Sequence, residues 1–595
     1  MQVVIDFTAR ALSVLLAVVP SPTPQGGAPI ATPPPTTAPA TSAPASTPTA
    51  VPARTAPPTA AATLAPSPTP VPTAVRPAAV AIVWHMPAAP SSDQSVRAAA
   101  IALSAPDTLG AIERALHAHP RARFSLTIDA SALAGLQSAA EGDSALQTLV
   151  AGHLVGGARA DLMRVLAQVP VLDASLAMTP AARRYRSLAA AAPLALAGQR
   201  SATFTSSDYV EFAGLGALVR LAAAGELSSA SDLSKNALTG EQAAAVLTQL
   251  AAADRKALDE LKQLAQAGQL EIIADPANEP ILPLLIDGGG KTGANIVMVN
   301  AAADAAMLSD QALHAATALQ TNAAGLYSPH GAYDDATATM LEQHHAAFAL
   351  FSDRVLRSSP IGGSRAAVIA ADTAAFHSYA IHAAAGPALA SLFWSQDDGA
   401  AISVLPPGLS ANAMGDRVTE LARAAGARGG EILVLRIEAE GLWNRRADRA
   451  RVVDALAAAL ASDRAPSTTI AQFVHAHPPT ISSYGFAPAA DAGNLSYWMG
   501  TLNQARMWTA LGDARQAAGG DAALQRETTR AALFEAEASR WYLTPDMIAP
   551  QSEVDRLMGQ FRALIAHIYQ DAGKQAPSGI APLTPEPTPG ARPHQ

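Results

Sequence analysis

The chain has no cysteine among its 595 residues, which excludes disulfides, thiolate metal sites, a cysteine nucleophile and a lipidated cysteine anchor. Basic residues are also scarce: the formal net charge is -9 and no basic stripe stands out, so nucleic acid is not expected as a partner. Long apolar runs are missing. The run Ala11–Val19 is shorter than the roughly 20 residues that a membrane-spanning helix needs.

Both ends of the chain have the composition of segments that do not fold. Residues 1–20 hold an apolar run of the length found in a signal peptide, although Asp6 and Arg10 make a weak charged region before it. Residues 21–76 are almost entirely Pro, Thr, Ala and Ser, and residues 574–595 form a shorter Pro-rich tail. Such segments bury too little apolar area to offset the entropy of ordering. We expect an exported or envelope-exposed protein, with residues 21–76 as a disordered linker.

Short apolar runs alternate with helical stretches between residues 77 and 480, which indicates parallel strands joined by helices in an α/β barrel or open sheet. One such helix is predicted over residues 240–267, where Thr239 and Gln242 have the spacing of a capping box and Gly268 ends the helix. Strand signals fade after residue 480, so residues 481–573 are predicted to form a helical domain. The candidate strands are Ala79–Val83, Arg123–Ile128, Leu270–Ala274, Ile296–Asn300, Phe348–Ser352, Ala388–Trp394 and Ile432–Ile437.

Residues 325–331 read Gly-Leu-Tyr-Ser-Pro-His-Gly. This block and several others, in order along the chain, resemble the family 57 glycoside hydrolases, which act on α-glucans. The matching loop of that family carries the nucleophilic glutamate, and His330 stands at the position of the glutamate. Residues 393–395, Phe-Trp-Ser, fall where the family has Phe-Arg-Asp, so Ser395 stands in the position of the general acid/base. Further similar blocks are residues 83–87, 124–136, 268–273, 280–285, 438–444, 497–515 and 536–542.

The resemblance implies an incomplete (β/α)7 barrel followed by a C-terminal α-helical domain. It also implies an α-glucan or other glycan as partner, with no cofactor and no metal. The substrate-binding candidates His85, Glu279 and Trp541 follow from the resemblance. The aromatic residues Trp84, Tyr327, Trp394 and Trp443 fall at or near predicted strand ends, where their rings are expected to stack on sugar rings. At six of the family's polar positions this chain carries a different residue, namely Pro87, Glu279, His330, Ser395, Gly441 and Arg540.

These replacements bear directly on the retaining mechanism, which needs two carboxyl groups about 5–5.5 Å apart. A neutral His330 has no negative charge to offer an oxocarbenium-like centre, and a protonated one repels it. The Ser395 hydroxyl is too weak an acid to protonate a leaving group near neutral pH. The sequence therefore predicts a catalytically impaired relative that still binds glycan.

Two alternatives stay open. An active hydrolase or transglycosylase could use displaced carboxylates, for which Asp398, Glu438 and Glu440 are the candidates. A metal-dependent polysaccharide deacetylase, whose family has a related incomplete barrel, would need an Asp-Asp pair after the first strand and a His-Ser-x-x-His pair that binds zinc. The residues that come nearest to that pattern are Asp129, His344, His345, His377 and His382.

Overall fold

The computed structural model describes residues 76–577, apart from residues 88–90, 92, 200–203, 288–298, 359–373, 383–387, 404–409, 440–446, 484 and 545–550. The predicted signal segment, almost all of the linker and most of the Pro-rich tail lie outside these residues. Within them, no helix combines the length and apolar character needed to cross a membrane. The described residues belong to one compact unit.

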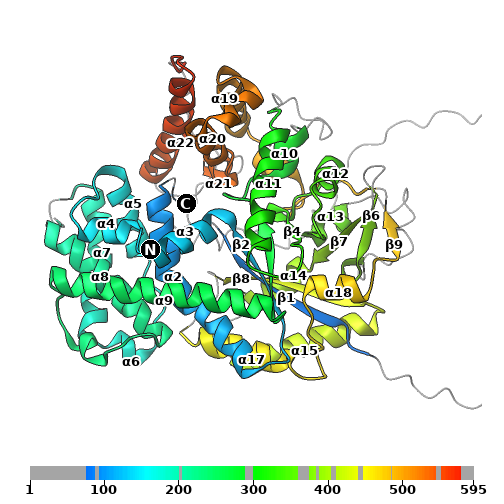
Figure 1. The fold of residues 1–595 in the computed structure, drawn as a ribbon, viewed down its shortest axis with the longest axis horizontal. Helices are drawn as coiled ribbons and strands as arrows, with labels where there is room; N and C mark the ends of the chain where they lie inside the picture. The colour runs from blue at the N-terminus through cyan, green and yellow to red at the C-terminus, as the bar shows by residue number, and fades with distance from the viewer. Residues whose placement is uncertain are drawn as a thin grey trace, which may run out of the picture. The chain divides into compact units, whose positions relative to one another are not determined.

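Nine strands form one mixed sheet in the order β8-β1-β2-β3-β4-β5-β7-β6-β9 (Figure 1). The seven strands from β8 to β7 run parallel, whereas β6 is antiparallel to β7 and β9 is parallel to β6. The bounds are β1 Ala79–Met86, β2 Phe124–Asp129, β3 Leu270–Asp275, β4 Leu326–Tyr327, β5 Ala349–Ser352, β6 Tyr379–Ile381, β7 Leu389–Trp394, β8 Ile432–Glu438 and β9 Ile481–Ser483.

The parallel strands curl until the two ends of the set meet, because the backbone N–H of Ser395, just after β7, donates to the carbonyl of Val434 in β8 at 2.9 Å. This is the incomplete seven-stranded barrel that the resemblance implies. Six of the predicted strands coincide with observed ones. The seventh, Ile296–Asn300, lies mostly outside the described residues, and its described part, Val299–Asn300, has no strand. The fourth barrel strand is instead the two-residue β4, which is too short to produce a periodic signal.

Between β2 and β3 the chain forms a helical insertion with its own hydrophobic core. Residues of α4, α5, α7 and α8 pack together there with parts of the long helices α2 and α9. The capping box predicted for α9 is confirmed: the Thr239 side chain accepts from the N–H of Gln242, and the Gln242 side chain accepts from the N–H of Thr239. The helices up to β3 are α2 Gln94–Ala118, α3 Ala130–Glu141, α4 Ala145–Val150, α5 Gly156–Ala167, α6 Ala174–Ala177, α7 Pro180–Leu196, α8 Ser206–Ala224 and α9 Gly240–Gln266.

The other helices cover the sheet or follow it. After β3 come α10 Leu282–Asp287, α11 Ala302–Thr317, α12 Asp335–Gln343, α13 Asp353–Ser358, α14 Gln396–Ser403, α15 Ala411–Ala427, α17 Arg449–Leu460 and α18 Ile470–Ala476. The C-terminal part is helical, with α19 Leu502–Ala517, α20 Glu527–Ala536, α21 Ser539–Leu543 and α22 Gln551–Asp571 (Figure 1).

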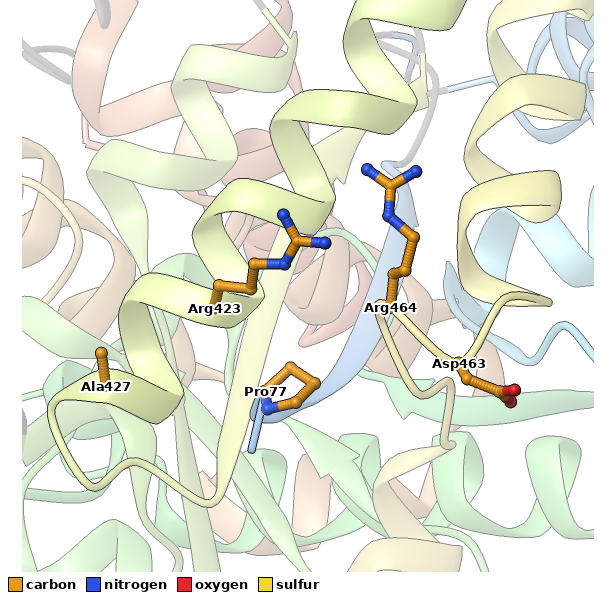
Figure 2. A pocket seen from close by; sticks show the side chains of 5 residues that line it. All are labelled: Pro77, Arg423, Ala427, Asp463 and Arg464. Carbon is orange, nitrogen blue, oxygen red and sulfur yellow. The ribbon is translucent and has the colours of Figure 1, made fainter. Parts of the chain in front are cut away.

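An open pocket of about 400 Å³ lies beside Pro77, directly before β1. Arg423 and Ala427 of α15 line it together with Asp463 and Arg464, which follow α17 (Figure 2). Its position at the start of β1 is the end of the barrel opposite to the one where barrel enzymes carry their active sites.

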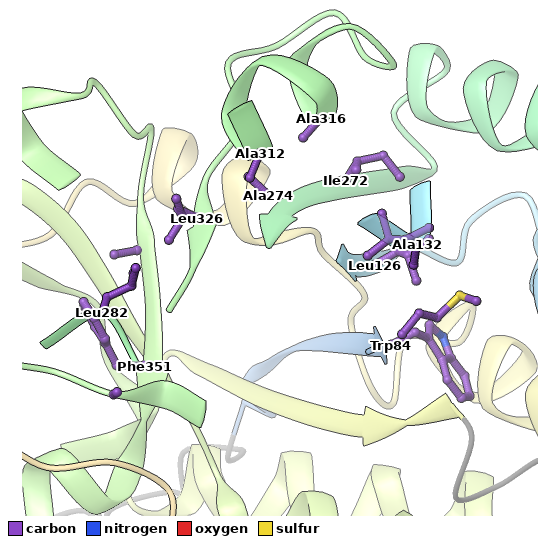
Figure 3. Close-up of a cluster of buried hydrophobic side chains, with 14 of the residues drawn as sticks. Trp84, Leu126, Ala132, Ile272, Ala274, Leu282, Ala312, Ala316, Leu326 and Phe351 are labelled. Atoms are coloured by element: carbon purple, nitrogen blue, oxygen red, sulfur yellow. The ribbon is translucent and has the colours of Figure 1, made fainter. Parts of the chain in front are cut away.

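The main hydrophobic core extends from the barrel into the C-terminal helices. Apolar side chains of β1 to β5 pack against helices such as α11, which contributes Ala312 and Ala316 (Figure 3). The same cluster contains Trp498, Trp508 and Trp541 from the C-terminal part. An isolated backbone bridge between Pro280 and Ala538 further connects the two regions. The barrel and the C-terminal helices therefore share one core.

Candidate functional site

Charged side chains gather where the parallel strands end. The strand register places His85 of β1 beside Glu438 of β8, and Asp129 of β2 beside Asp275 of β3. Parallel strands end at the same edge of a sheet, so side chains from neighbouring strands converge there, as they do in barrel active sites. We call this group the strand-end cluster. It comprises His85, Asp129, Asp275, Glu279, His330, Arg436, Glu438 and Asp491.

His85 is the buried centre of the first half of this cluster. Its Nδ1 atom lies 2.7 Å from the Thr127 hydroxyl and 3.6 Å from a carboxylate oxygen of Asp275. Its Nε2 atom lies 2.9 Å from a carboxylate oxygen of Glu279. Glu279 follows Asn278 in a turn where both residues have positive φ, 67° and 49°, an unusual backbone for residues other than glycine. This turn brings the Glu279 carboxylate back over the end of β1.

The three acids of this half have very different proton affinities. Burial alone would raise the pKa of Glu279, but the hydrogen bond to His85 and the positive charges of His85, His330 and Arg436 lower it to about 2. Burial raises the pKa of Asp275 well above its usual value, and the carboxylates of Glu279 and Asp129 raise it further. Burial also raises the pKa of Asp129 to about 6, although Ser131 lowers it by hydrogen bonding. Glu279 is therefore ionised at neutral pH, whereas Asp275 holds its proton more tightly than an ordinary aspartate.

His330 begins the second half of the cluster and has a left-handed backbone, with φ of 56°. Its Nε2 atom lies 2.9 Å from the Ser539 hydroxyl, and its Nδ1 atom lies 3.7 Å from a carboxylate oxygen of Asp491. Its ring also packs against Trp498, with 5.0 Å between centroids. Burial lowers the pKa of His330, but Asp491 and Glu279 outweigh burial and raise it above its usual value. The two acids therefore stabilise the protonated form of the imidazole at this position.

Arg436 lies on β8 between two aromatic rings. Its guanidinium carbon is 5.3 Å from the ring centre of Tyr327 and 5.3 Å from that of Trp394, within cation–π range. It also forms an ion pair with Glu438 at 2.6 Å. Burial lowers the pKa of Arg436, but Glu438 and the other nearby acids outweigh this and raise it. Arg436 is therefore a fixed positive charge within the cluster.

Ser395 and its neighbours form a separate set of contacts. The buried Ser395 hydroxyl donates to a carboxylate oxygen of Asp398 at 2.8 Å. Asp397 forms ion pairs with Arg354 at 2.7 Å and with Arg357 at 3.2 Å. Asp398, one of the carboxylates considered for an active enzyme, is therefore hydrogen-bonded to Ser395, the residue at the acid/base position.

The predicted sugar-stacking aromatic residues lie deeper than expected. Trp84 is 0% exposed, and Tyr327, Trp394 and Trp541 are each 1% exposed, so these rings present no free face in this conformation. Trp84 packs edge-on against Phe124 at 5.7 Å. The predicted residues Glu440 and Trp443 lie outside the described residues, as does Gly441.

The histidines considered for a deacetylase are not brought together at the strand-end cluster. His344 lies 2.6 Å from Asp310, and His377 lies 3.6 Å from Glu431. Asp129 does belong to the cluster, where one carboxylate oxygen caps α3 by accepting from the N–H of Ser131 at 2.7 Å. The acid of that pattern therefore lies at the strand ends, whereas His344 and His377 pair with acids elsewhere.

Solved structures with a similar chain course come from carbohydrate-active enzymes. A branching enzyme of glycoside hydrolase family 57 from Thermococcus kodakaraensis aligns with a TM-score of 0.49 and 12% identity, over 83% of this chain and 89% of that one. A 4-α-glucanotransferase from Thermococcus litoralis gives 0.48 and 10%, over 83% and 60%. The α-amylase AmyC from Thermotoga maritima gives 0.48 and 10%, over 84% and 93%.

No protein-family profile matches the chain, and no curated protein is similar to it at a significant level. At 10–12% identity, the side chains of a site can differ completely between two proteins. The chemistry of the strand-end cluster therefore has to be derived from the residues of this chain.

Four residues of the site escaped the sequence prediction. Asp275 had a detectable signal, because it is the first polar residue after an apolar strand. Arg436 interrupts an apolar strand, which is also detectable. Asp491 and Tyr497 come from the segment after β9, and no local pattern indicates that this segment reaches the strand ends. Tyr497 is 47% exposed and packs edge-on against Trp498, which contacts His330.

Proposed function

We propose that this chain binds an α-glucan or a related glycan at the strand-end cluster, and that it does not hydrolyse it by the two-carboxylate retaining mechanism. The observation that carries the proposal is the combination of partly exposed polar groups with an exposed aromatic ring. Glu279, Glu438 and Asp491 are 19%, 33% and 18% exposed. Tyr497, which is 47% exposed, adjoins the cluster through Trp498, which contacts His330, and through the nearby charge of Asp491. Polar groups that converge next to an aromatic face are the usual composition of a sugar site.

The charge at His330 argues against retaining chemistry at that position. A retaining nucleophile is an anion that stabilises an oxocarbenium-like centre. Asp491 and Glu279 stabilise the protonated form of His330 by raising its pKa, and an imidazole is an anion in neither its neutral nor its protonated form. Ser395 is 5% exposed and its proton is directed to Asp398, so it is not available to a leaving oxygen. Neither group supplies the function of the carboxyl group that it replaces.

In this proposal Tyr497 supplies the sugar-stacking ring that was predicted at the strand-end tryptophans. Its phenol ring is held edge-on by Trp498 at 5.0 Å, which fixes its direction while leaving nearly half of it exposed. A fixed, exposed ring can cover the apolar face of a sugar, and its hydroxyl can bond to a sugar hydroxyl.

Calorimetric titration of the full chain with maltooligosaccharides and cell-wall glycans tests the proposal. We expect Tyr497→Ala to weaken binding roughly three- to tenfold, in line with about 0.5–1.5 kcal/mol for an aromatic contact. Tyr497→Phe keeps the ring and retains most of the affinity. Val155→Ala, at a 67% exposed position in the helical insertion, is the matched control and leaves binding unchanged. No heat with any glycan would reject the proposal.

An active glycosidase remains the second candidate, because Glu279 is ionised and partly exposed at the strand ends. Such a carboxylate has the charge that an oxocarbenium-like centre requires. A sensitive amylose assay on the full chain, with Glu279→Gln, Glu438→Gln, Glu440→Gln and Asp398→Asn tested singly, decides this. Measurable hydrolysis that one of these changes abolishes would favour the second candidate over the first.

The proposal also includes a location outside the cytoplasm, supported by the signal-like run in residues 1–20 and the Pro-rich segment 21–76. Fractionation of the native host, with immunodetection of the chain in envelope and medium, tests this part.

A further inference from the structure

Three side chains of the strand-end cluster bring metal-ligand atoms together. One possible ligand atom from each of His85, Asp275 and Glu279 lies within 4.8 Å of the other two. Among the described residues, no other group of three or more histidine, aspartate or glutamate side chains meets this criterion. We propose that these three residues bind one divalent transition-metal ion. The proposal goes beyond glycan binding and can be tested without any glycan.

A second observation points to a missing cation. Asp275 is 0% exposed, and within the described part of the chain neither of its carboxylate oxygens accepts a hydrogen bond. Nδ1 of His85 lies 3.6 Å from one of these oxygens, beyond hydrogen-bond range. Asp129 is also 0% exposed and is paired with Asp275 in the sheet register. One of its carboxylate oxygens likewise accepts no hydrogen bond from the described part of the chain. A buried carboxylate oxygen without donors is costly, and a bound cation removes that cost.

The environment of His85 also suits a metal ligand. Thr127 lies 2.7 Å from Nδ1 and can hold the ring through that atom, as second partners of ligating histidines do. Nε2 lies 2.9 Å from the Glu279 oxygen, and a proton joins these two atoms in the hydrogen bond described above. A divalent ion that displaced this proton would be bound by both atoms. Metal bonds of about 2.0–2.2 Å put neighbouring ligand atoms roughly 3–4 Å apart, so small side-chain adjustments complete the site.

The donor set indicates the class of ion. One imidazole nitrogen with two carboxylates favours Zn²⁺ or Mn²⁺ over Mg²⁺ and Ca²⁺, which prefer oxygen ligands alone. Three protein ligands leave at least one position for water, and Glu279 is 19% exposed, so solvent can reach the ion from that side. A bound divalent ion would polarise such a water molecule or a sugar hydroxyl.

Metal binding by the full chain tests the inference. Protein without a histidine tag is stripped with a chelator, dialysed, and titrated separately with Zn²⁺ and Mn²⁺, with elemental analysis of the reloaded protein. We expect about one equivalent of one of these ions. Asp275→Asn and His85→Gln should each weaken binding at least tenfold. Asp254→Asn is the matched control, since Asp254 is another fully buried acid without a hydrogen-bond partner in the described chain, remote in α9, and it should bind metal like the wild type.

Circular dichroism separates lost binding from lost folding. If His85→Gln does not fold, Thr127→Val leaves all three ligands in place and should weaken binding about 10–100-fold through the loss of the ring's second partner. Wild-type protein that retains neither ion after reloading overturns the inference. Equal affinity of folded Asp275→Asn and wild type also overturns it. Glycan binding that fails while metal binding persists would reject only the proposed function.

Discussion

At the scale of single residues, burial of ionisable groups governs how this protein responds to pH. Glu113 of α2 is an acid of this kind outside the strand-end cluster, and it is 7% exposed. Burial and the nearby Glu260 and Glu226 raise the pKa of Glu113 to about 8, while Arg114 and Lys256 only partly oppose this. The folded state therefore holds a proton on Glu113 over a pH range in which the unfolded chain has lost it.

We predict that Glu113 makes the protein less stable as the pH rises from about 4.5 to about 8. In that range the unfolded state binds fewer protons than the folded state, so the free energy of unfolding falls with pH, by at most about 1.4 kcal/mol per unit. Glu113→Gln should remove this slope and be more stable than the wild type at pH 8. Denaturant unfolding at pH 5, 6.5 and 8 measures it. The exposed control Glu141→Gln should keep the wild-type slope, and an unchanged slope in Glu113→Gln would contradict the prediction.

The sequence located some site residues and misjudged the environment of others. His85 and Glu438 come at the ends of apolar runs that predict strands, whereas Glu279 and His330 were located through the resemblance to family 57. The burial of Trp84, Tyr327 and Trp394 was not predicted. Strands that are covered on both faces have no alternation of polar and apolar residues, so the sequence does not show which way a ring points. Contacts such as His330 with Asp491 join segments 161 positions apart, and no local pattern encodes them.

At the scale of elements, the turn after β4 sets the geometry of the site. Gly331 has φ of 59°, and a Cβ atom there would lie 2.3 Å from the Trp394 ring and 2.4 Å from the backbone nitrogen of Ser352. Only glycine fits between β5 and β7 at this point. The turn therefore fixes His330 next to both strands.

We predict that Gly331→Ala lowers the free energy of unfolding by roughly 2–5 kcal/mol, from left-handed strain plus overpacking. Gly225→Ala is the matched control: its φ is 74°, but a Cβ atom there would meet nothing within 4 Å. Its cost should be only about 1 kcal/mol. Chemical denaturation of both variants measures the difference. Equal costs would mean that the close approach to Trp394 and Ser352 does not constrain the turn.

Elements with strong local signals were predictable, and short ones were not. The capping box of α9 was found because two side chains three residues apart determine it. By contrast, β4 has two residues and β6 has three, and pairing with neighbouring strands rather than local preference defines them. Their alignment in the sheet depends on tertiary contacts that sequence periodicity does not reveal.

At the scale of the whole molecule, the barrel and the C-terminal helices depend on each other. They share one hydrophobic cluster, and the buried ion pair of Arg515 with Asp304 joins α19 to α11. A second ion pair, of Arg97 with Glu535 at 2.6 Å, joins α2 to α20. The sequence predicted a boundary near residue 480 from the fading of strand signals, a criterion that does not detect a shared core.

We predict that a chain ending at residue 480 does not fold as a stable barrel, because it exposes the part of the core that Trp498, Trp508 and Trp541 cover. Differential scanning calorimetry and limited proteolysis should show no cooperative transition and rapid degradation. A chain ending at residue 577, which lacks only the Pro-rich end, is the control and should keep the wild-type melting temperature. A soluble, cooperatively melting fragment of residues 77–480 would contradict the prediction.

The meeting of β7 and β8 has a consequence for how the barrel fluctuates. Neighbouring parallel strands elsewhere are paired in register, whereas these two are linked through the bond from Ser395 to Val434. We therefore expect β7 and β8 to separate with a smaller free-energy cost than β1 and β2. Amide hydrogens between β7 and β8 should exchange with solvent deuterium sooner than those between β1 and β2. The amide of Ser395 is among those that we expect to exchange early.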